Sequence, residues 1–138
     1  MKSEIDIIIE TAKYYNSSNT AVNNIGACTY MNEDGDMCAV GRCLSEEGMK
    51  IFKEFEDKNS ANDTSVIYFF KLYGKDNFQN ALKEEYRGHD IVFWQKLQQL
   101  HDSKYSWYED GINNFGFDLI GKLFGLDKGF LVKEALAK

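Results

Sequence analysis

Three cysteines and one histidine could in principle bind a metal. Cys28, Cys38, Cys43 and His101 would supply three sulfurs and one nitrogen to zinc. Structural zinc sites use closely spaced ligand pairs, because one turn must present both sulfurs. Cys38 and Cys43 are separated by four residues, but strand alternation and a change of chain direction at Gly41 make it uncertain that both thiols face the same point. We therefore expect no metal and no cofactor.

A thiol nucleophile is the second chemistry that these residues could host. Cys38 with His101 and an orienting Asp or Gln would imitate a cysteine hydrolase. Reactive thiolates lie at helix N-termini or in positive surroundings, whereas Cys38 is expected in mid-strand beside apolar neighbours. Glutamate pairs such as Glu46–Glu47 read as solvated helix faces, and the glycines form no phosphate-binding loop. The sequence therefore predicts no enzyme, with a small metal- or thiol-dependent enzyme as an alternative.

Aromatic and hydrogen-bonding side chains could instead line a pocket for a small molecule, because such pockets combine apolar walls with a few polar groups. The rings could stack a base, and the donors could hold a phosphate or a base edge. Arginine suits anion recognition best, and the chain has only two arginines. The candidate ligand-binding residues are Tyr30, Arg42, Arg87, Trp94, Gln98, His101 and Trp107. Each has a structural alternative: the tryptophans in the core, an acidic partner or carbonyl caps for the arginines, and a helix end for His101.

Composition limits the class of protein. The 138 residues predict one domain, 1–138, that is large enough for a core without metals or disulfides. A net charge of −6 argues against binding to nucleic acid or to an anionic membrane surface. No apolar run is long enough to span a membrane, and the N-terminus lacks the pattern of a signal peptide, so we expect a cytoplasmic protein. The many tyrosines and phenylalanines are compatible with self-association.

Helical periodicity dominates the chain and must position the candidate residues. Ser3 can cap a first helix whose predicted inner stripe is Ile5, Ile8, Ile9, Ala12 and Tyr15. The run 66–73 fits a buried strand or a buried helix, and we favour a helix that Gly74 ends. The remaining predicted helices are 46–57 after Ser45, 91–101 after Asp90, 114–124 between Asn113 or Asn114 and Gly125, and a last short segment at 130–137.

A β-hairpin is predicted from Ala27 to Gly41, with Glu33-Asp34-Gly35 as a three-residue loop. This register pairs Tyr30 with Cys38 and Cys28 with Val40. All four side chains then share one apolar face. A four-residue loop would instead place Cys28 opposite Ala39. The predicted fold class is α+β: a mostly helical single domain of about five helices with one antiparallel β-hairpin.

Two blocks resemble a pattern found in small, uncharacterised phage and bacterial proteins. The first is Cys28-Thr29-Tyr30, then Gly35, then the run Cys38–Leu44. The second is the run Phe93–Asp102, which contains Leu97-Gln98-Gln99-Leu100-His101-Asp102 and is followed by Trp107. The resemblance extends from Ala27 to Gly116, with Trp94 where an aliphatic residue is usual and no acidic Pro-Asp segment after Leu44. It implies a phage or prophage origin and no particular reaction.

These observations lead to one functional expectation. We expect a non-enzymatic phage or prophage accessory protein that binds a small, anionic, nucleotide-like molecule and sequesters a host defence signal. The site is expected where the strand end at Arg42 meets the helix that carries His101. The alternative is a protein-interaction module that inhibits or adapts a host protein.

Overall fold

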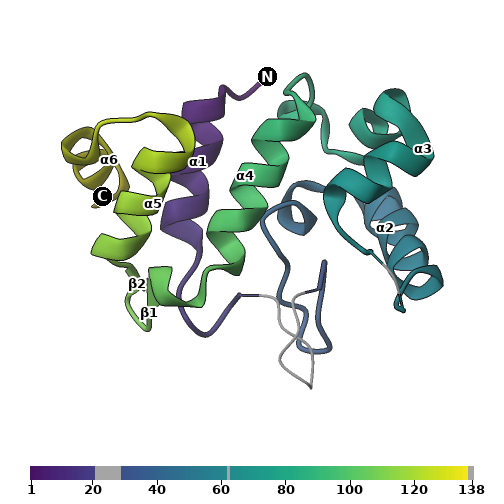
Figure 1. Ribbon diagram of the computed structural model, residues 1–138, viewed down its shortest axis with the longest axis horizontal. Helices are drawn as coiled ribbons and strands as arrows, with labels where there is room; N and C mark the ends of the chain where they lie inside the picture. Colours follow the sequence, from purple (N-terminus) through teal and green to yellow (C-terminus); the bar gives the residue numbers. More distant parts are fainter. Residues whose placement is uncertain (21–28, 62, 137–138) are drawn as a thin grey trace.

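Six α-helices and one short antiparallel sheet form the described part of the chain (Figure 1). The computed structural model describes residues 1–20, 29–61 and 63–136. The helices are α1 Glu4–Tyr14, α2 Glu46–Lys58, α3 Val66–Ala81, α4 Ile91–Asp102, α5 Asn114–Phe124 and α6 Lys128–Leu136. The strands are β1 Trp107–Tyr108 and β2 Gly111–Ile112, and 3₁₀ turns lie at η1 Gly41–Cys43, η2 Glu84–Tyr86 and η3 Lys104–Ser106. The predicted α+β class is confirmed.

Polar side chains at the N-termini explain where the helices begin. An N-cap oxygen accepts a hydrogen bond from a backbone N–H that has no partner within the helix. Such caps are present at Ser3, Ser45, Ser65, Asp90 and Asn113. All but the cap at Ser65 were predicted, so the helix starts were readable locally. The predicted stop at Gly125 is also confirmed by its left-handed backbone, with φ of 68°.

The sequence predicted that Gly74 ends the helix, whereas Gly74 interrupts α3 and the chain resumes helical structure immediately afterwards, as far as Ala81. Its φ of 86° and ψ of 168° break the helical geometry between Val66 and Ala81. Only glycine adopts such angles without strain. The second part of α3 thereby turns Phe78 into the core, where its side chain is fully buried.

The predicted hairpin between Ala27 and Gly41 is corrected by the structure. Ala27 and Cys28, with the pair Cys28–Val40, lie outside the described residues. An isolated bridge joins Met31 to Met37, and the Cys38 N–H donates to the Tyr30 carbonyl at 3.1 Å, which is the predicted register. Beyond Cys38 the chain turns into η1, because local N–H groups satisfy the carbonyls there. The antiparallel sheet is instead β1–β2, in a segment outside the predicted helices and the predicted hairpin.

The buried face of α1 also differs from the predicted stripe. Ile7, Ile8, Thr11 and Ala12 are buried, whereas Ile5 is 40% exposed and Ile9 is only partly covered. The difference arises because α1 packs between α6 and β2 on one side and the segment around Arg42 on the other. The buried positions 7, 8, 11, 12 and 15 still recur at helical spacing, so the buried stripe is displaced around the helix from the predicted one.

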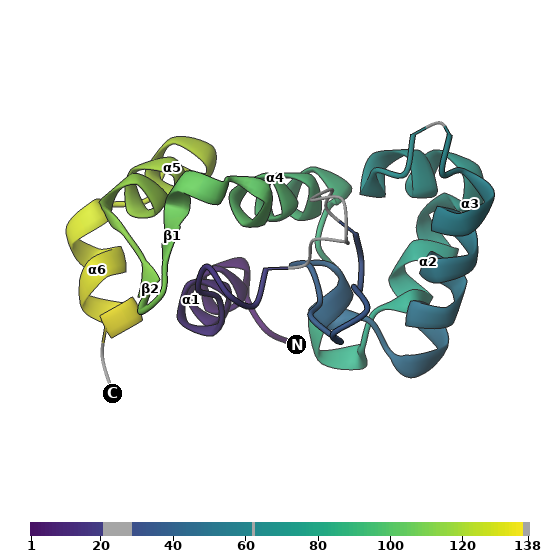
Figure 2. The same cartoon turned by 90° about the horizontal axis from the view of Figure 1, so that it is seen from below.

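Aromatic packing holds α2 against α3 at one end of the molecule, while α5 and α6 lie at the other end and α4 lies between the two ends (Figure 2). The rings of Phe52 and Phe69 stack with centroids 3.9 Å apart, and Phe55 meets Phe69 edge-on at 5.2 Å. The two ends are joined where Phe78 meets Trp94 of α4 at 6.4 Å. Helix α4 therefore lies between the two ends and contacts both.

Among the helices of the described residues, none is both long enough and apolar enough to cross a membrane.

Close approach of α2 to the end of α3 requires glycine at position 48. A Cβ atom there would lie 1.9 Å from the Ala81 carbonyl oxygen. We expect Gly48→Ala to lower the free energy of unfolding by roughly 2 kcal/mol, because backbone must move to admit the methyl group. At an open helical position the same change would stabilise by about 0.5–1 kcal/mol. Urea denaturation measures the difference, with Glu54→Ala on the exposed face of α2 as the control. A gain in stability for Gly48→Ala would contradict the packing.

Candidate functional site

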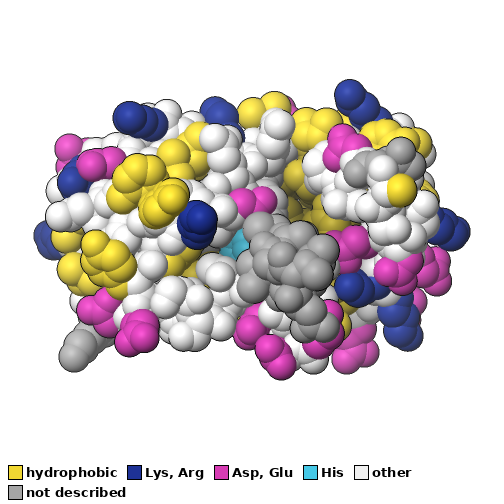
Figure 3. Space-filling view, turned by 60° about the horizontal axis from the view of Figure 1, so that its bottom comes forward, with side chains coloured by type: hydrophobic (Ala, Val, Ile, Leu, Met, Phe, Trp, Pro, Cys, Tyr) yellow, Lys and Arg dark blue, Asp and Glu magenta, His cyan; other side chains and the backbone are white. Residues whose placement is uncertain are grey.

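A cavity of about 800 Å³ lies between α4 and the N-terminal end of α3. This volume is in the range of small-molecule sites. On the face drawn in Figure 3, apolar side chains are visible at the bottom of a hollow, with acidic side chains at its edges. The described lining residues are Thr29, Tyr30, Cys38, Glu56, Asp63, Thr64, Ser65, Val66, Gln95, Gln98, Gln99, Asp102 and Ser103.

Polar contacts attach the segment after residue 28 to α2 and α3 and thereby form one side of the cavity. The Tyr30 hydroxyl donates to the Thr64 carbonyl at 2.7 Å, and its ring meets Phe52 edge-on at 4.8 Å. The Glu56 carboxylate accepts from the Thr29 hydroxyl at 2.7 Å and from the Tyr30 N–H at 3.2 Å. These contacts place the ring of Tyr30 and the carboxylate of Glu56 in the wall.

The opposite wall is the polar face of α4. The Gln98 side-chain amide donates to Asp102 Oδ1 at 2.9 Å, and its carbonyl oxygen accepts from the Val40 N–H at 3.3 Å. Nδ1 of the buried His101 lies 2.8 Å from the same Asp102 oxygen. Because both ends of the Gln98 amide are engaged, the side chain has one orientation, and Asp102 is held beside it.

The charged side chains in the described lining are all carboxylates. They are Glu56, Asp63 and Asp102, and the described lining contains no lysine or arginine. Hydrogen bonds from Ser65 lower the pKa of Asp63. Lys53 lies outside the lining and reaches Glu56 from α2 at 2.9 Å, which compensates one of the three charges. The wall therefore attracts positive charge or hydrogen-bond donors.

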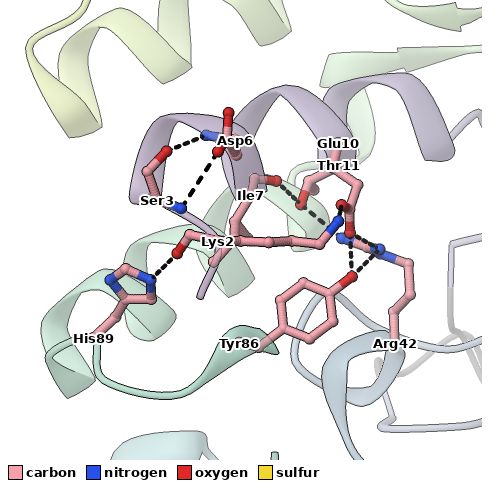
Figure 4. Close-up of polar contacts among 9 residues, drawn as sticks. All are labelled: Lys2, Ser3, Asp6, Ile7, Glu10, Thr11, Arg42, Tyr86 and His89. Carbon is pink, nitrogen blue, oxygen red and sulfur yellow. Dashed lines mark hydrogen bonds and ion pairs between the residues drawn. The ribbon is translucent and has the colours of Figure 1, made fainter. Parts of the chain in front are cut away.

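Arg42 lies away from the cavity, in a partly buried cluster that joins α1 to η1 and η2 (Figure 4). Its Nη1 is 2.5 Å from Glu10 Oε1, and its Nη2 donates to the Thr11 hydroxyl at 3.3 Å. The Tyr86 hydroxyl donates to the same Glu10 oxygen, and Lys2 lies 2.5 Å from the other. The charge of Arg42 is thus compensated inside the protein, which is the structural alternative to anion binding.

Glu10 is held ionised by this cluster. Burial alone would raise the pKa of its carboxyl, but hydrogen bonds from Lys2, Tyr86 and Arg42 outweigh burial and lower the pKa to about 2. The Glu10 carboxylate therefore stays ionised, and keeps its ion pair, at pH values low enough to protonate an ordinary glutamate. The cluster is built for structure, since every charged group in it faces a partner.

Three further candidates have structural roles. Arg87 donates to the carbonyls of Leu82 at 3.1 Å and Asn80 at 3.4 Å, and so closes the end of α3. Trp94 is fully buried between aromatic neighbours. Trp107 is buried as well, and its indole N–H donates to the His101 carbonyl at 3.2 Å.

The structure therefore brings only part of the predicted site together. Tyr30 and Gln98 line the cavity, and His101 contacts it through Asp102. Arg42, Arg87, Trp94 and Trp107 are not among its lining residues. The site was expected beside the helix that carries His101, and the cavity does lie beside that helix. The guanidinium group of Arg42, on which this expectation depended, is not part of the lining.

Sequence reasoning missed most of the polar lining. Gln95, Gln98, Gln99 and Asp102 recur at helical spacing on the face of α4 opposite its apolar stripe, and that pattern could have found them. Glu56 and Thr64 carry no comparable local signal, because their contacts with residues 29 and 30 span more than 25 positions.

The cysteines described by the structure have a packing role. Cys38 and Cys43 are buried, and burial raises the pKa of both thiols, that of Cys43 to about 12. Cys38 Sγ accepts the Gly41 N–H at 3.2 Å. Cys28 lies outside the described residues. Among those residues, no group of three or more His, Cys, Asp or Glu could hold a metal ion.

Comparisons with known proteins add no relative: no family model, curated protein or solved structure matches this chain.

Glu10→Gln tests the buried cluster through its pH dependence. The folded-state pKa of about 2 lies below the ordinary 4.5, so the stabilisation is complete above about pH 4.5 and is lost as the pH falls towards 2. We expect the variant to lose roughly 2 kcal/mol of unfolding free energy at neutral pH, and the difference from wild type to shrink in acid. Urea denaturation at several pH values measures it, with Glu54→Gln as the exposed control. A difference that is constant with pH would contradict the ion pair.

The buried thiols should be inert in the folded protein. We expect Cys38 and Cys43 to react with iodoacetamide roughly a hundredfold more slowly in buffer than in denaturing urea, because the thiolate is disfavoured and shielded. Peptide mass spectrometry resolves each site, and the unfolded protein is the control. Fast alkylation of Cys38 in buffer would revive the thiol-enzyme alternative.

Proposed function

We propose that this protein is a non-enzymatic binding protein that holds a small organic molecule in the cavity between α3 and α4. The observation that carries the proposal is a cavity of about 800 Å³ whose walls combine apolar side chains with oriented polar groups. Tyr30, Cys38 and Val66 supply the apolar part, and Gln98 with Asp102 supplies the polar part.

A binding role fits this site better than catalysis. The thiol in the wall, Cys38, is buried and accepts a hydrogen bond from Gly41, so it is no poised nucleophile. Asp102 and His101 are neighbours on α4, but the imidazole is covered by Tyr15 and fully buried at its side chain. General acid–base catalysis needs direct reach to the reacting group, which these positions do not favour.

The biological role that we propose is that of an accessory protein which sequesters its ligand. This part depends on the resemblance of the two sequence blocks to small phage and bacterial proteins, so phage origin and a defence signal as ligand remain predictions. We do not propose an anionic ligand, because Arg42 pairs with Glu10 and Arg87 donates to carbonyls at the end of α3. Docking of a host protein is the competing function.

Gln99→Trp tests the cavity as the binding site. Gln99 is an exposed lining residue on α4, so an indole there would narrow the cavity without entering the core. In a fragment screen by ligand-observed NMR, with fragments that are cationic, neutral and anionic, we expect hits whose affinity falls about tenfold or more in this variant. Val92→Trp, at a 45% exposed position of α4 outside the lining, is the control.

Two outcomes would count against the proposal. If no fragment of any charge binds, the cavity is not a ligand site, and copurification of a stoichiometric protein partner would then favour the interaction module. If fragments bind equally to wild type and Gln99→Trp, they occupy another part of the molecule.

A further inference from the structure

The charged side chains in the described part of the cavity wall are all carboxylates, which are hydrogen-bond acceptors. Asp102 Oδ1 already has Gln98 and His101 as partners, but the other oxygen, Oδ2, has none within the described residues. The Asp102 side chain is 39% exposed and belongs to the lining, so its carboxylate is accessible from the cavity. A carboxylate oxygen accepts hydrogen bonds and donates none when ionised.

The neighbouring groups strengthen this preference. Gln98 cannot turn its amide N–H groups into the cavity without losing Asp102 and Val40. The last turn of α4 ends here at Asp102, and the C-terminal end of a helix carries partial negative charge. Asp63, which precedes the N-cap of α3, adds a further carboxylate, and the described lining offers no lysine or arginine to balance it.

The charge carrier that suits this wall is an organic cation. A metal ion would need several closely placed ligands, and no suitable group of three exists among residues 1–20, 29–61 and 63–136. An ammonium or amidinium group needs fewer, since one carboxylate oxygen and nearby amide or hydroxyl oxygens satisfy its N–H groups. A phosphate or carboxylate would face the carboxylates of Glu56, Asp63 and Asp102 with no lysine or arginine in the described lining.

We propose that the ligand presents a cationic nitrogen, as a primary amine or an amidine, to Asp102 Oδ2, with an apolar portion against Tyr30 and Val66. The inference rests on the proposed function, because it names the ligand class of the same cavity. Asp102 is then the residue that decides specificity, and Gln98 is a positioning residue that holds the carboxylate through its amide.

Three probes of similar size separate charge from shape: phenethylamine, 2-phenylethanol and phenylacetate. We expect the amine to bind about tenfold or more tightly than the alcohol or the acid, measured by protein-observed NMR titration. Asp102→Asn keeps the Oδ1 acceptor for Gln98 but removes the charge. We expect it to weaken amine binding about tenfold and to leave the alcohol unchanged. Asp110→Asn, exposed in the turn between β1 and β2, makes the same charge change away from the cavity and should alter neither.

The outcomes distinguish this inference from the proposed function. Equal affinity of the wild-type protein for the three probes would overturn the preference for a cation and leave the cavity as a binding site. The comparison on wild type needs no variant, so a folding defect in Asp102→Asn cannot obscure it. If no fragment of any charge binds at all, the proposed function fails together with the inference.

Discussion

The ion pair between Arg42 and Glu10 is the contact on which the arrangement around the cavity depends. A guanidinium group that is nearly buried is costly unless its charge is balanced, and here Glu10 balances it from α1. Thr11 and Tyr86 complete the cluster, so three segments far apart in the chain, α1, η1 and η2, meet at one point. The position of η1 in turn fixes where the preceding loop can run.

That loop is held by side chains rather than by a sheet. Tyr15, directly after α1, donates to the Met37 carbonyl at 2.6 Å, and Lys53 of α2 donates to the Met31 carbonyl at 3.1 Å. Gln98 captures the Val40 N–H from α4. Backbone groups that a strand would have paired are therefore satisfied by helices on both sides, because buried backbone groups need a partner of some kind. The cavity is what remains between the loop, α3 and α4.

The small number of arginines explains why Arg42, the best anion-binding candidate in the sequence, does not line the cavity. Two arginines serve a chain of net charge −6, and both are used where the fold needs a planar donor: one opposite Glu10, one on the last carbonyls of α3. The polar groups of the cavity wall are therefore mainly carboxylates and amides, because both arginines form contacts elsewhere in the fold.

Local signals in the sequence were sufficient for the helices. Ser3, Ser45 and Asp90 each cap the helix predicted after them, and Gly74 and Gly125 change the backbone where expected, because caps and left-handed glycines act within a few residues. The register at Met31–Met37 was also readable from its glycine turn. The second strand of that hairpin could not be predicted in the same way. Whether residues 38–43 form a strand or a turn depends on contacts with helices that are distant in the sequence, such as those of Gln98 and Glu10.

The site shows the same division more sharply. Residue types alone determined that the chain has few arginines, buried cysteines and abundant rings, and they identified Tyr30, Gln98 and the neighbourhood of His101. Only the tertiary structure decided which polar groups remain available, since Glu10 and Arg42 are 32 positions apart and Thr29 and Glu56 are 27 apart. Pairing between distant charges leaves no periodic trace in a sequence. The partners therefore become visible only when the fold brings them together.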